Sequence, residues 1–542
     1  MLPQSISRWF AWLPALRLVA MFGTSACALA QPVASPRRAL HPQLLVFITV
    51  DQMRADYFER FGAEFTGGLR LLREHGAFFP HAFQDHAITE TAPGHAATLS
   101  GRFPVHTGIA TNAQGVNGVP DAQVINGHLG ESASPYRFRG TTLIDWLRAA
   151  DSTTRWLSVS RKDRGAILPV GKSRGNVYWY HPSGVFTTSR YYADSLPKWV
   201  QMFNAEVPAA SYAGKSWTLL RDASAYPEPD SVGIEANAVG ADFAFPHVVP
   251  ENPDEANAVL ANFPFMDELT LRFALRGVNE LQLGAARNRT DVLAISLSTT
   301  DAVGHRWGPD SRELHDQILR LDQYLGGFLD SLIALRGAEH VLVVLTADHG
   351  VTPFPTLKSA IYPNSGAKRV TLDRPWLAFK QRLLSRGIDT AAVAIEEGMV
   401  VVTNPAAFGR AGADALLRDL ARDLMRVQGV QRVDLMTDLA RADTASDTIA
   451  RRWLHMFSPQ SNVRLVATLE AYSSWLPVTY ATHGSPSDAD ANVPIVFFGP
   501  GIAAGTYQDT VRVVDIAPTL AAILDVRPLE PVDGRIIRAI AP

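Results

Sequence analysis

Residues 44–54 read LLVFITVDQMR, a run of apolar and β-branched residues that ends at a carboxylate. Such a run, without polar alternation, is typical of a strand buried on both faces, as in parallel sheets. Four more runs share this character: RWLSVS (155–160), VLAISLS (292–298), HVLVVLTA (340–347) and VPIVFF (493–498). These five runs predict the core of one sheet.

Helical patterns separate the runs. In residues 313–336, for example, Leu314, Ile318, Leu321 and Leu325 recur at helical spacing. Strands that alternate with helices predict an α/β fold with a mainly parallel central sheet flanked by helices.

Two long stretches interrupt this alternation. Residues 165–285 are rich in Tyr, Trp, Pro and Asn, and we interpret them as a lid over one edge. Residues 356–480 contain the runs GMVVVTN, ADALLRDLARDLMRVQ and VQRVDLM, which predict a strand–helix–strand unit in an inserted α+β cap. The main domain would then comprise 40–355 plus 481–542, with its last strand supplied after the insertion.

The N-terminus has the features of a secretory signal peptide. Residues 1–30 carry Arg8 and Arg17 but no acid, and an apolar stretch leads to Ala28-Leu29-Ala30, a small-x-small cleavage pattern. The alternatives are a membrane anchor, for which the apolar run is short, and lipid attachment at Cys27. We therefore predict a secreted, periplasmic protein.

Charge and cysteine content narrow the class of protein. Without residues 1–30 the chain has 48 basic and 53 acidic residues, a net charge of −5, so we expect no nucleic-acid binding. Cys27 is the only cysteine, and a core of this size can be stable without disulfides. No later stretch reaches transmembrane length.

Carboxylates and histidines follow the predicted strands. They are Asp51, then Asp301 and His305, then Asp348 and His349, and finally His483 before the last strand. Each could be a helix cap, a turn former or an ordinary histidine. Because ligands bind at the carboxyl ends of parallel strands, we expect the six side chains to converge. Asp and His donors suit zinc, and six of them suit two ions rather than one.

A hydroxyl-bearing segment, ITETAPGHAATLSG (88–101), precedes a predicted helix. Pro93 suits a first helical position, which would place Thr91 at a helix N-terminus, where backbone N–H groups favour anions. Thr91 could be a metal-activated nucleophile or simply a cap. From spacing alone, Thr89 remains a competing hydroxyl.

The motifs VDQMR, TAPGHAATLSG, RKDRGAILPVG, STTDAVGH, TADHG and THG occur in one order. In this the chain resembles the alkaline phosphatase superfamily, and most of all its phosphate-irrepressible alkaline phosphatase branch, which is similar to nucleotide pyrophosphatase/phosphodiesterases. The resemblance runs from about residue 44 to the C-terminus, is weakest in the two insertions, and implies an alkaline phosphatase-like catalytic domain.

The resemblance also implies roles. One zinc would be held by Asp51, Asp348, His349 and Thr91, and the other by Asp301, His305 and His483. Thr91 would attack phosphorus and form a phosphothreonine, which a water activated by the second zinc would hydrolyse. The family pattern does not use His95 as a ligand, so we expect it to be structural.

Lys162 and Arg164 bear on the substrate class. They stand at i and i+2 after a predicted strand, so in an extended segment they would point the same way. The alternative is a solvated basic stretch. A lysine and an arginine fork suit the phosphoryl dianion of a monoester. In the resembling branch this Lys-x-Arg pair marks phosphomonoesterases, and Asn112 matches the position of an amide donor to a phosphoryl oxygen, although it could be a turn former.

The sequence thus predicts a monomeric two-zinc phosphomonoesterase acting on small-molecule phosphate esters. The alternative enzyme is a phosphodiesterase or nucleotide pyrophosphatase with the same two-zinc threonine mechanism. A sulfatase is disfavoured because the nucleophile position offers no Cys or Ser. An inactive phosphate- or zinc-binding protein is the alternative outside enzymes.

Overall fold

The computed structural model describes residues 42–117, 122–230, 244–355, 366–408, 413–476 and 481–541. The predicted signal peptide, with Cys27, lies outside these residues. Among the helices described, none is both long enough and apolar enough to cross a membrane.

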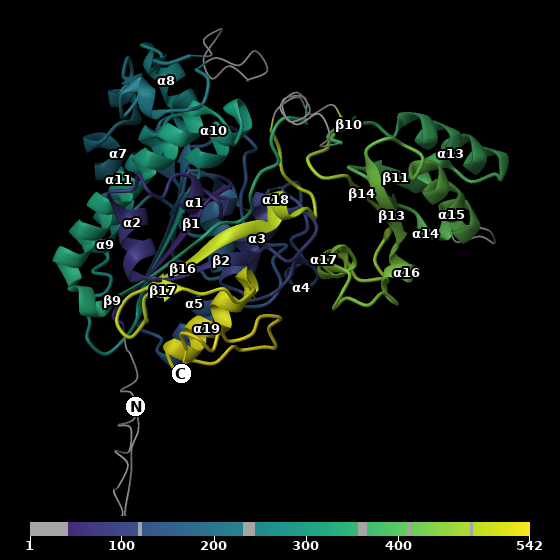
Figure 1. The fold of residues 1–542 in the computed structure, drawn as a ribbon. Helices are drawn as coiled ribbons and strands as arrows, with labels where there is room; N and C mark the ends of the chain where they lie inside the picture. The colour runs from purple at the N-terminus through teal and green to yellow at the C-terminus, as the bar shows by residue number, and fades with distance from the viewer. Residues whose placement is uncertain are drawn as a thin grey trace, which may run out of the picture. The chain divides into compact units, whose positions relative to one another are not determined.

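Ten strands of the described chain form the central sheet (Figure 1). In spatial order they are β17 (Gly505–Thr506), β2 (Ala77–Phe83), β16 (Asn492–Phe498), β9 (Val341–Thr346), β1 (Leu44–Val50), β8 (Asp291–Leu297), β3 (Trp156–Ser160), β4 (Asn176–His181) and β5 (Val185–Thr187), with β18 (Val511–Arg512) beside β2. The five predicted runs are β1, β3, β8, β9 and β16. Strands β9, β1, β8, β3 and β4 are parallel, whereas β16 runs antiparallel to β9 and β2. The prediction of a mainly parallel sheet is confirmed.

Helices form two groups around this sheet (Figure 1). One group contains α2 (Gly68–His75), α9 (Phe265–Glu280), α10 (Thr299–Trp307) and α11 (Arg312–Arg336), of which α11 packs against the other three. The other contains α3 (Thr91–Thr98), α5 (Leu143–Ala150), α6 (Asp163–Ile167) and α19 (Ile516–Ile523). The pattern at 313–336 therefore predicts α11 to within one residue. Short helices α1 (Tyr57–Arg60), α4 (Pro104–Thr107) and α18 (Asp488–Ala491) lie in connections.

The stretch 165–285 contributes directly to the central fold. It supplies β4 and β5 to the sheet, and its helix α9 packs on β3 and β8. Its other elements are α7 (Lys198–Glu206), α8 (Pro253–Val259) and the pair β6 (Ser216–Trp217) and β7 (His247–Val248). The interpretation of the whole stretch as a lid stays a prediction.

The described part of 356–480 has its own sheet and its own core. The sheet order is β11 (Val393–Glu396), β12 (Met399–Val402), β14 (Val463–Leu469) and β13 (Val430–Leu435). Its helices are α13 (Asp373–Ser385), α14 (Pro405–Phe408), α15 (Ala413–Leu424), α16 (Met436–Leu439) and α17 (Thr448–Met456), and β10 (Arg369–Val370) pairs with β15 (Ser474–Trp475). The predicted strand–helix–strand unit corresponds to β12, α15 and β13. We call this region the insertion.

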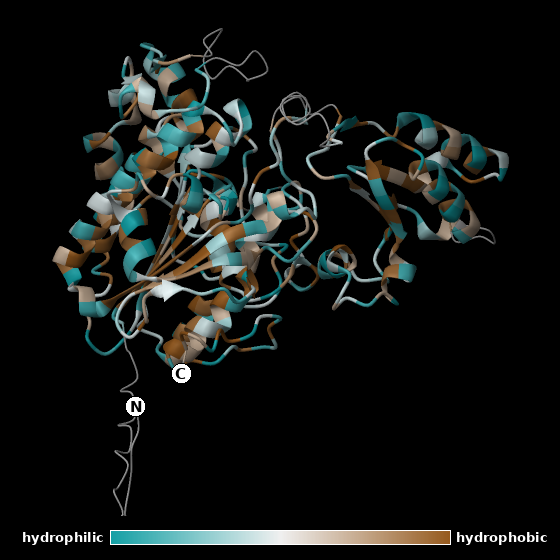
Figure 2. Cartoon of the chain, in the orientation of Figure 1, coloured by the Kyte–Doolittle hydropathy of each residue, from teal (hydrophilic) through white to brown (hydrophobic). Residues whose placement is uncertain are grey.

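Apolar packing stabilises the central sheet and also joins the insertion to the main domain. Strands β1, β8 and β9 of the central sheet are mostly apolar and entirely buried (Figure 2). A separate cluster joins Trp453 and Met399 of the insertion to Ala87, Ile88 and Ala110 of the main domain. The insertion therefore packs directly on the segment that leads to Thr91.

Candidate active site

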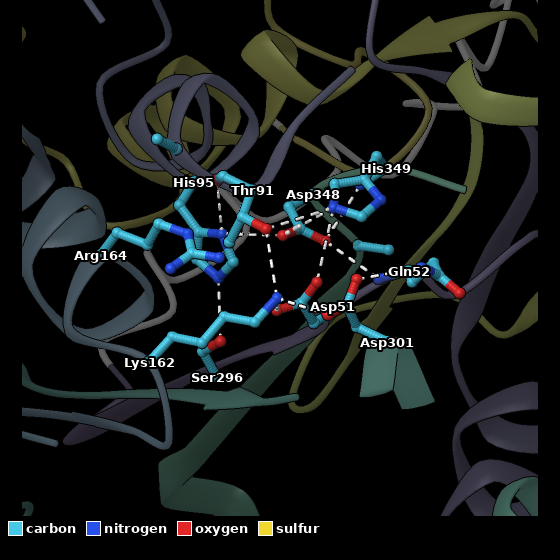
Figure 3. A network of polar contacts seen from close by, with 12 residues as sticks. Asp51, Gln52, Thr91, His95, Lys162, Arg164, Ser296, Asp301, Asp348 and His349 are labelled. Carbon is cyan, nitrogen blue, oxygen red and sulfur yellow. Dashed lines mark hydrogen bonds and ion pairs between the residues drawn. The ribbon is translucent and has the colours of Figure 1, made fainter. Parts of the chain in front are cut away.

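Three buried carboxylates lie together at the carboxyl ends of the parallel strands. Asp51 follows β1, Asp348 follows β9, and Asp301 lies in the first turn of α10, just after β8. Because β1 pairs in register with both neighbours, the three strands end at the same edge of the sheet. Figure 3 shows the carboxylates gathered there.

The first predicted ligand set is brought together. Potential ligand atoms of Asp51, Asp348 and His349 lie within 4.8 Å of one another. His349 Nε2 is 3.5 Å from Asp51 Oδ1 and 3.6 Å from Asp348 Oδ2. All three side chains are fully buried.

The second predicted set lies beside the first. His305 Nε2 is 3.2 Å from Asp301 Oδ1 and 3.2 Å from His483 Nε2, and His483 Nε2 is 3.6 Å from Asp301 Oδ1. His349 also lies within 4.8 Å of Asp301 and His483, and its ring stacks on that of His483 at 3.6 Å. The two sets therefore adjoin through His349.

All three histidines are oriented in the same way. Each one donates from Nδ1 to a backbone carbonyl, which leaves Nε2 directed at the carboxylates. The pairs are His305 with Ala481 at 2.7 Å, His349 with Gly350 at 2.9 Å and His483 with Thr89 at 2.8 Å. A histidine whose second nitrogen is engaged in this way presents a bare nitrogen, as metal-binding histidines do.

The site has a surplus of buried negative charge. Asp51 accepts no hydrogen bond from the described residues on either oxygen, and neither does Asp348 Oδ2, although ion pairs with Lys162 and His95 lie close. Burial raises the pKa of Asp51 to about 7, with Asp301 and Asp348 adding to the effect and Lys162 opposing it. Buried carboxylates with open oxygens beside bare imidazole nitrogens fit divalent cations of the zinc type.

Thr91 is not a helix cap. It is the first residue of α3, and the cap position belongs to Glu90. We predicted that Pro93 is the first helical residue, but it is the third. Proline fits there because the first N–H groups of a helix have no partner within it. Thr91 Oγ1 lies 3.2 Å from Lys162 Nζ and 3.4 Å from His349 Nε2, and the residue is 1% exposed.

The Thr89 hydroxyl forms its hydrogen bonds with the loop that carries His483. Its Oγ1 donates to the Ser485 carbonyl at 2.9 Å and accepts from Gly484 N at 3.2 Å. The hydroxyl thus ties the segment before Thr91 to the loop that carries His483.

Lys162 and Arg164 do not share an extended segment, contrary to our prediction. Helix α6 begins at Asp163, so Lys162 is its N-cap residue and Arg164 lies in its first turn. Lys162 Nζ lies 2.6 Å from Asp51 Oδ2 and 2.7 Å from Asp301 Oδ2, between the two ligand sets (Figure 3). Arg164 is the second residue of α6, which packs against α3, and its Nε has no hydrogen-bond partner among the described residues.

Asn112 is anchored to the start of α3. Its Oδ1 accepts from Ala92 N at 2.9 Å, and its backbone N–H donates to Glu90. The bond fixes the amide plane beside Thr91 and leaves the Nδ2 group on the opposite side of the amide.

His95 and Gln52 are also buried in the site. The sequence predicted only a structural role for His95 and no role for Gln52. His95 Nδ1 lies 3.0 Å from Asp348 Oδ2 and 2.9 Å from the Thr91 carbonyl, and its Nε2 is 2.9 Å from Ser296 Oγ. Gln52 donates its backbone N–H to Asp348 Oδ1 at 3.1 Å and its Nε2 to Asp301 Oδ1 at 2.9 Å. Its place directly after Asp51 is the only sequence signal for Gln52.

Comparison with known proteins places this geometry in context. Residues 45–411 match the family model described as type I phosphodiesterase / nucleotide pyrophosphatase. The chain is 30% identical over 528 residues to alkaline phosphatase PhoV of Synechococcus elongatus, covering 94% of both chains. It is 29% identical over 526 residues to a protein of Myroides odoratus named calcium-transporting ATPase, covering 92% of this chain and 95% of that one.

Sequence and structure also relate the chain to alkaline phosphatase PafA. The PafA of Elizabethkingia meningoseptica is 28% identical over 507 residues, covering 90% of this chain and 92% of that one. A crystal structure of wild-type PafA matches with a TM-score of 0.85 at 26% identity, over 93% of this chain and 99% of that one. With 93% of this chain covered, the likeness extends into both 165–285 and 356–480.

Proposed function

Because the chain belongs to the type I phosphodiesterase / nucleotide pyrophosphatase family of the alkaline phosphatase superfamily, we propose that it is a phosphomonoesterase with a threonine nucleophile. The observation that carries the proposal is the position of Thr91. Its hydroxyl lies at a helix N-terminus, within 3.2 Å of a lysine ammonium and 3.4 Å of a bare imidazole nitrogen.

Two zinc ions fit the two ligand sets. Asp51, Asp348, His349 and Thr91 would hold one, and Asp301, His305 and His483 the other. Bound there, the ions would supply positive charge that lowers the pKa of the Thr91 hydroxyl and of a water molecule and that offsets charge on the phosphoryl oxygens.

Thr91 forms and releases the covalent intermediate. Its Oγ attacks phosphorus, the bond to the leaving oxygen breaks, and the leaving alcohol takes up a proton. Water then attacks the phosphothreonine, which releases phosphate and restores the hydroxyl. The N-terminus of α3 favours the anionic group throughout through the helix dipole, although the Ala92 N–H is engaged by Asn112 Oδ1 and Pro93 has no N–H.

Three side chains of this chain bind the phosphoryl group. Lys162 already contacts the Thr91 hydroxyl, and it carries a single positive charge suited to one non-bridging oxygen. Arg164 reaches the same group from α6 with its forked donors, and Asn112 donates from Nδ2 while Oδ1 holds it to α3. Two cations beside one phosphoryl group favour a dianionic monoester over a monoanionic diester.

The rest of the proposal concerns location, oligomeric state and substrate, and the N-terminal pattern supports its location. Residues 1–30 direct export, and the enzyme acts as a periplasmic monomer on small phosphate esters. The ATPase name of the Myroides relative is compatible, since the terminal phosphoryl group of ATP also presents three non-bridging oxygens.

The family name favours a second candidate, a phosphodiesterase or nucleotide pyrophosphatase. The two are separated by the turnover of an aryl phosphate monoester and of its matching aryl diester on zinc-loaded protein. We expect a higher kcat/KM for the monoester. Faster turnover of the diester would replace the proposed activity with the second candidate.

A further inference from the structure

One buried amide contacts both predicted zinc sites. Gln52 is fully buried and lies beside Asp51 and Asp301 at the edge of the network (Figure 3). Its backbone N–H bonds to Asp348 Oδ1 of the first set, and its side-chain Nε2 bonds to Asp301 Oδ1 of the second. Lys162 Nζ also contacts a carboxylate of each set, Asp51 and Asp301, whereas Gln52 is a neutral donor to Asp348 and Asp301.

The backbone at Gln52 is held in an unfavourable conformation. Its φ is +68°, in the left-handed region that residues other than glycine rarely adopt. Such a conformation persists where the surroundings impose it, and it concentrates at functional sites. Here the conformation turns the N–H toward Asp348 while the side chain reaches Asp301.

The neighbouring helix leaves room for the amide. A Cβ at Gly304 would lie 1.8 Å from Gln52 Oε1, so only glycine accepts the side chain as it stands. Gly304 lies in α10 between Asp301 and His305, which both belong to the second set. The glycine therefore permits the bond between Gln52 and Asp301.

We propose that Gln52 is a positioning residue that fixes the carboxylates of the two zinc sites relative to each other. The proposal rests on the two-zinc function proposed above. Hydrogen bonds to ligating carboxylates fix their orientation, and Gln52 supplies one to Asp301 Oδ1, the oxygen that faces His305 and His483, through its side chain and one to Asp348 Oδ1 through its backbone. Removing the side chain alone should weaken only the Asp301 site.

Gln52→Gly removes the side-chain bond while it keeps the backbone bond. Glycine keeps the backbone N–H and accepts the positive φ, so the bond to Asp348 survives while the bond to Asp301 is lost. Gln282→Gly is the matched control, because Gln282 also has a positive φ of 50° and donates Nε2 to a carbonyl, that of Asn279, far from both sets. Gly304→Ala displaces the amide of Gln52 without changing Gln52.

The test is zinc retention by the full-length, zinc-loaded protein against increasing chelator, measured by elemental analysis. We expect Gln52→Gly and Gly304→Ala to lose one of two zinc ions at roughly 10- to 100-fold lower chelator concentration than wild type, with the other ion unchanged. Gln282→Gly should match wild type. If Gln52→Gly and Gly304→Ala retain both zinc ions as wild type does, or lose both ions in parallel, the proposed role of Gln52 is overturned. A wild-type protein that never holds two zinc ions overturns the two-zinc proposal together with this one.

Discussion

The carboxylates of the site and the residues that complete it are held by different kinds of structure. Asp51 and Asp348 directly follow β1 and β9, whose strands are entirely buried in the central sheet. Thr91 and His483 instead lie on segments beyond the sheet's strand ends, and these segments contact the insertion. The strand ends are fixed within the buried sheet. The outer segments are held in place by contacts with the insertion, which we call the brace.

Helix α17 of the insertion provides that brace. Arg452 donates NH1 to the Pro486 carbonyl, three residues after His483, at 2.6 Å, and its own carbonyl accepts from Ala87 N at 3.1 Å. Arg451 forms a bidentate contact with the buried Asp85. One helix thus holds both the approach to Thr91 and the loop of His483, so a distant substitution there should affect these two residues but leave the carboxylates in place.

The two kinds of structure meet at the predicted metal ions, so metal removal should have the largest effect. Purified mature protein is expected to bind close to two zinc ions, and exhaustive chelation should abolish turnover because the surplus of buried carboxylate charge is then unopposed. Elemental analysis together with an activity assay checks this. One ion per chain, or full activity after chelation, would contradict the two-set description.

The proposed nucleophile, Thr91, lies on the braced segment. Thr91→Ala should lower kcat by roughly 10³-fold or more, as expected when a covalent nucleophile is lost. Thr89→Ala should be much milder, because the Thr89 hydroxyl contacts only the loop of His483. Steady-state kinetics of the two variants decide the matter, and near-normal kcat in Thr91→Ala would remove Thr91 from the mechanism.

The proposed phosphoryl contacts come from Lys162, which precedes α6, and from Arg164 in the first turn of α6. Each charge-assisted bond contributes roughly 1.5–3 kcal/mol, and each 1.36 kcal/mol is about tenfold in rate. Lys162→Ala/Arg164→Ala should therefore lower monoester kcat/KM on the order of a hundredfold or more, if the two contributions add. Diester kcat/KM should fall much less. Equal losses on both substrates would show that the pair supports the fold or binds both substrates uniformly.

The brace should have the smallest effect on activity. Arg452→Met removes the bond to the Pro486 carbonyl and should lower the free energy of unfolding by roughly 1.5–3 kcal/mol, and kcat/KM by about tenfold through His483 and Thr91. Arg451→Met is the comparison within α17, because it removes the contact with Asp85 but leaves the bond to the Pro486 carbonyl. Denaturant unfolding and kinetics should rank Arg452→Met as the more damaging. The reverse order would mean that α17 anchors the insertion without bracing the site.

The difference between the two regions also explains what the sequence could predict. Buried parallel strands have a plain apolar signature, so the runs that form β1, β8 and β9, and the carboxylates that follow them, could be read directly. The convergence of Thr91 and His483 depends on contacts between residues almost 400 positions apart, as between His483 Nδ1 and the Thr89 carbonyl. Periodicity carries no information about such contacts, and here the family resemblance supplied the assignment.

Local backbone conformation at the site was the other feature that the sequence did not predict. The segment after β3 was predicted to be extended, yet α6 begins at Asp163, and Lys162 before it contacts Asp51 and Asp301. The positive φ of Gln52 has no sequence signature either, because glutamine is not a residue that favours this conformation. Both departures occur at the site itself, where tertiary contacts outweigh local preference.

The most direct test of the account is the location of the covalent intermediate. Zinc-loaded protein is mixed with a labelled phosphate monoester, quenched in acid, digested and analysed by mass spectrometry. The account predicts a phosphopeptide spanning residues 88–101 with the phosphoryl group on Thr91, and no label in Thr91→Ala. Label on Thr89, or turnover with label on neither threonine, would contradict it.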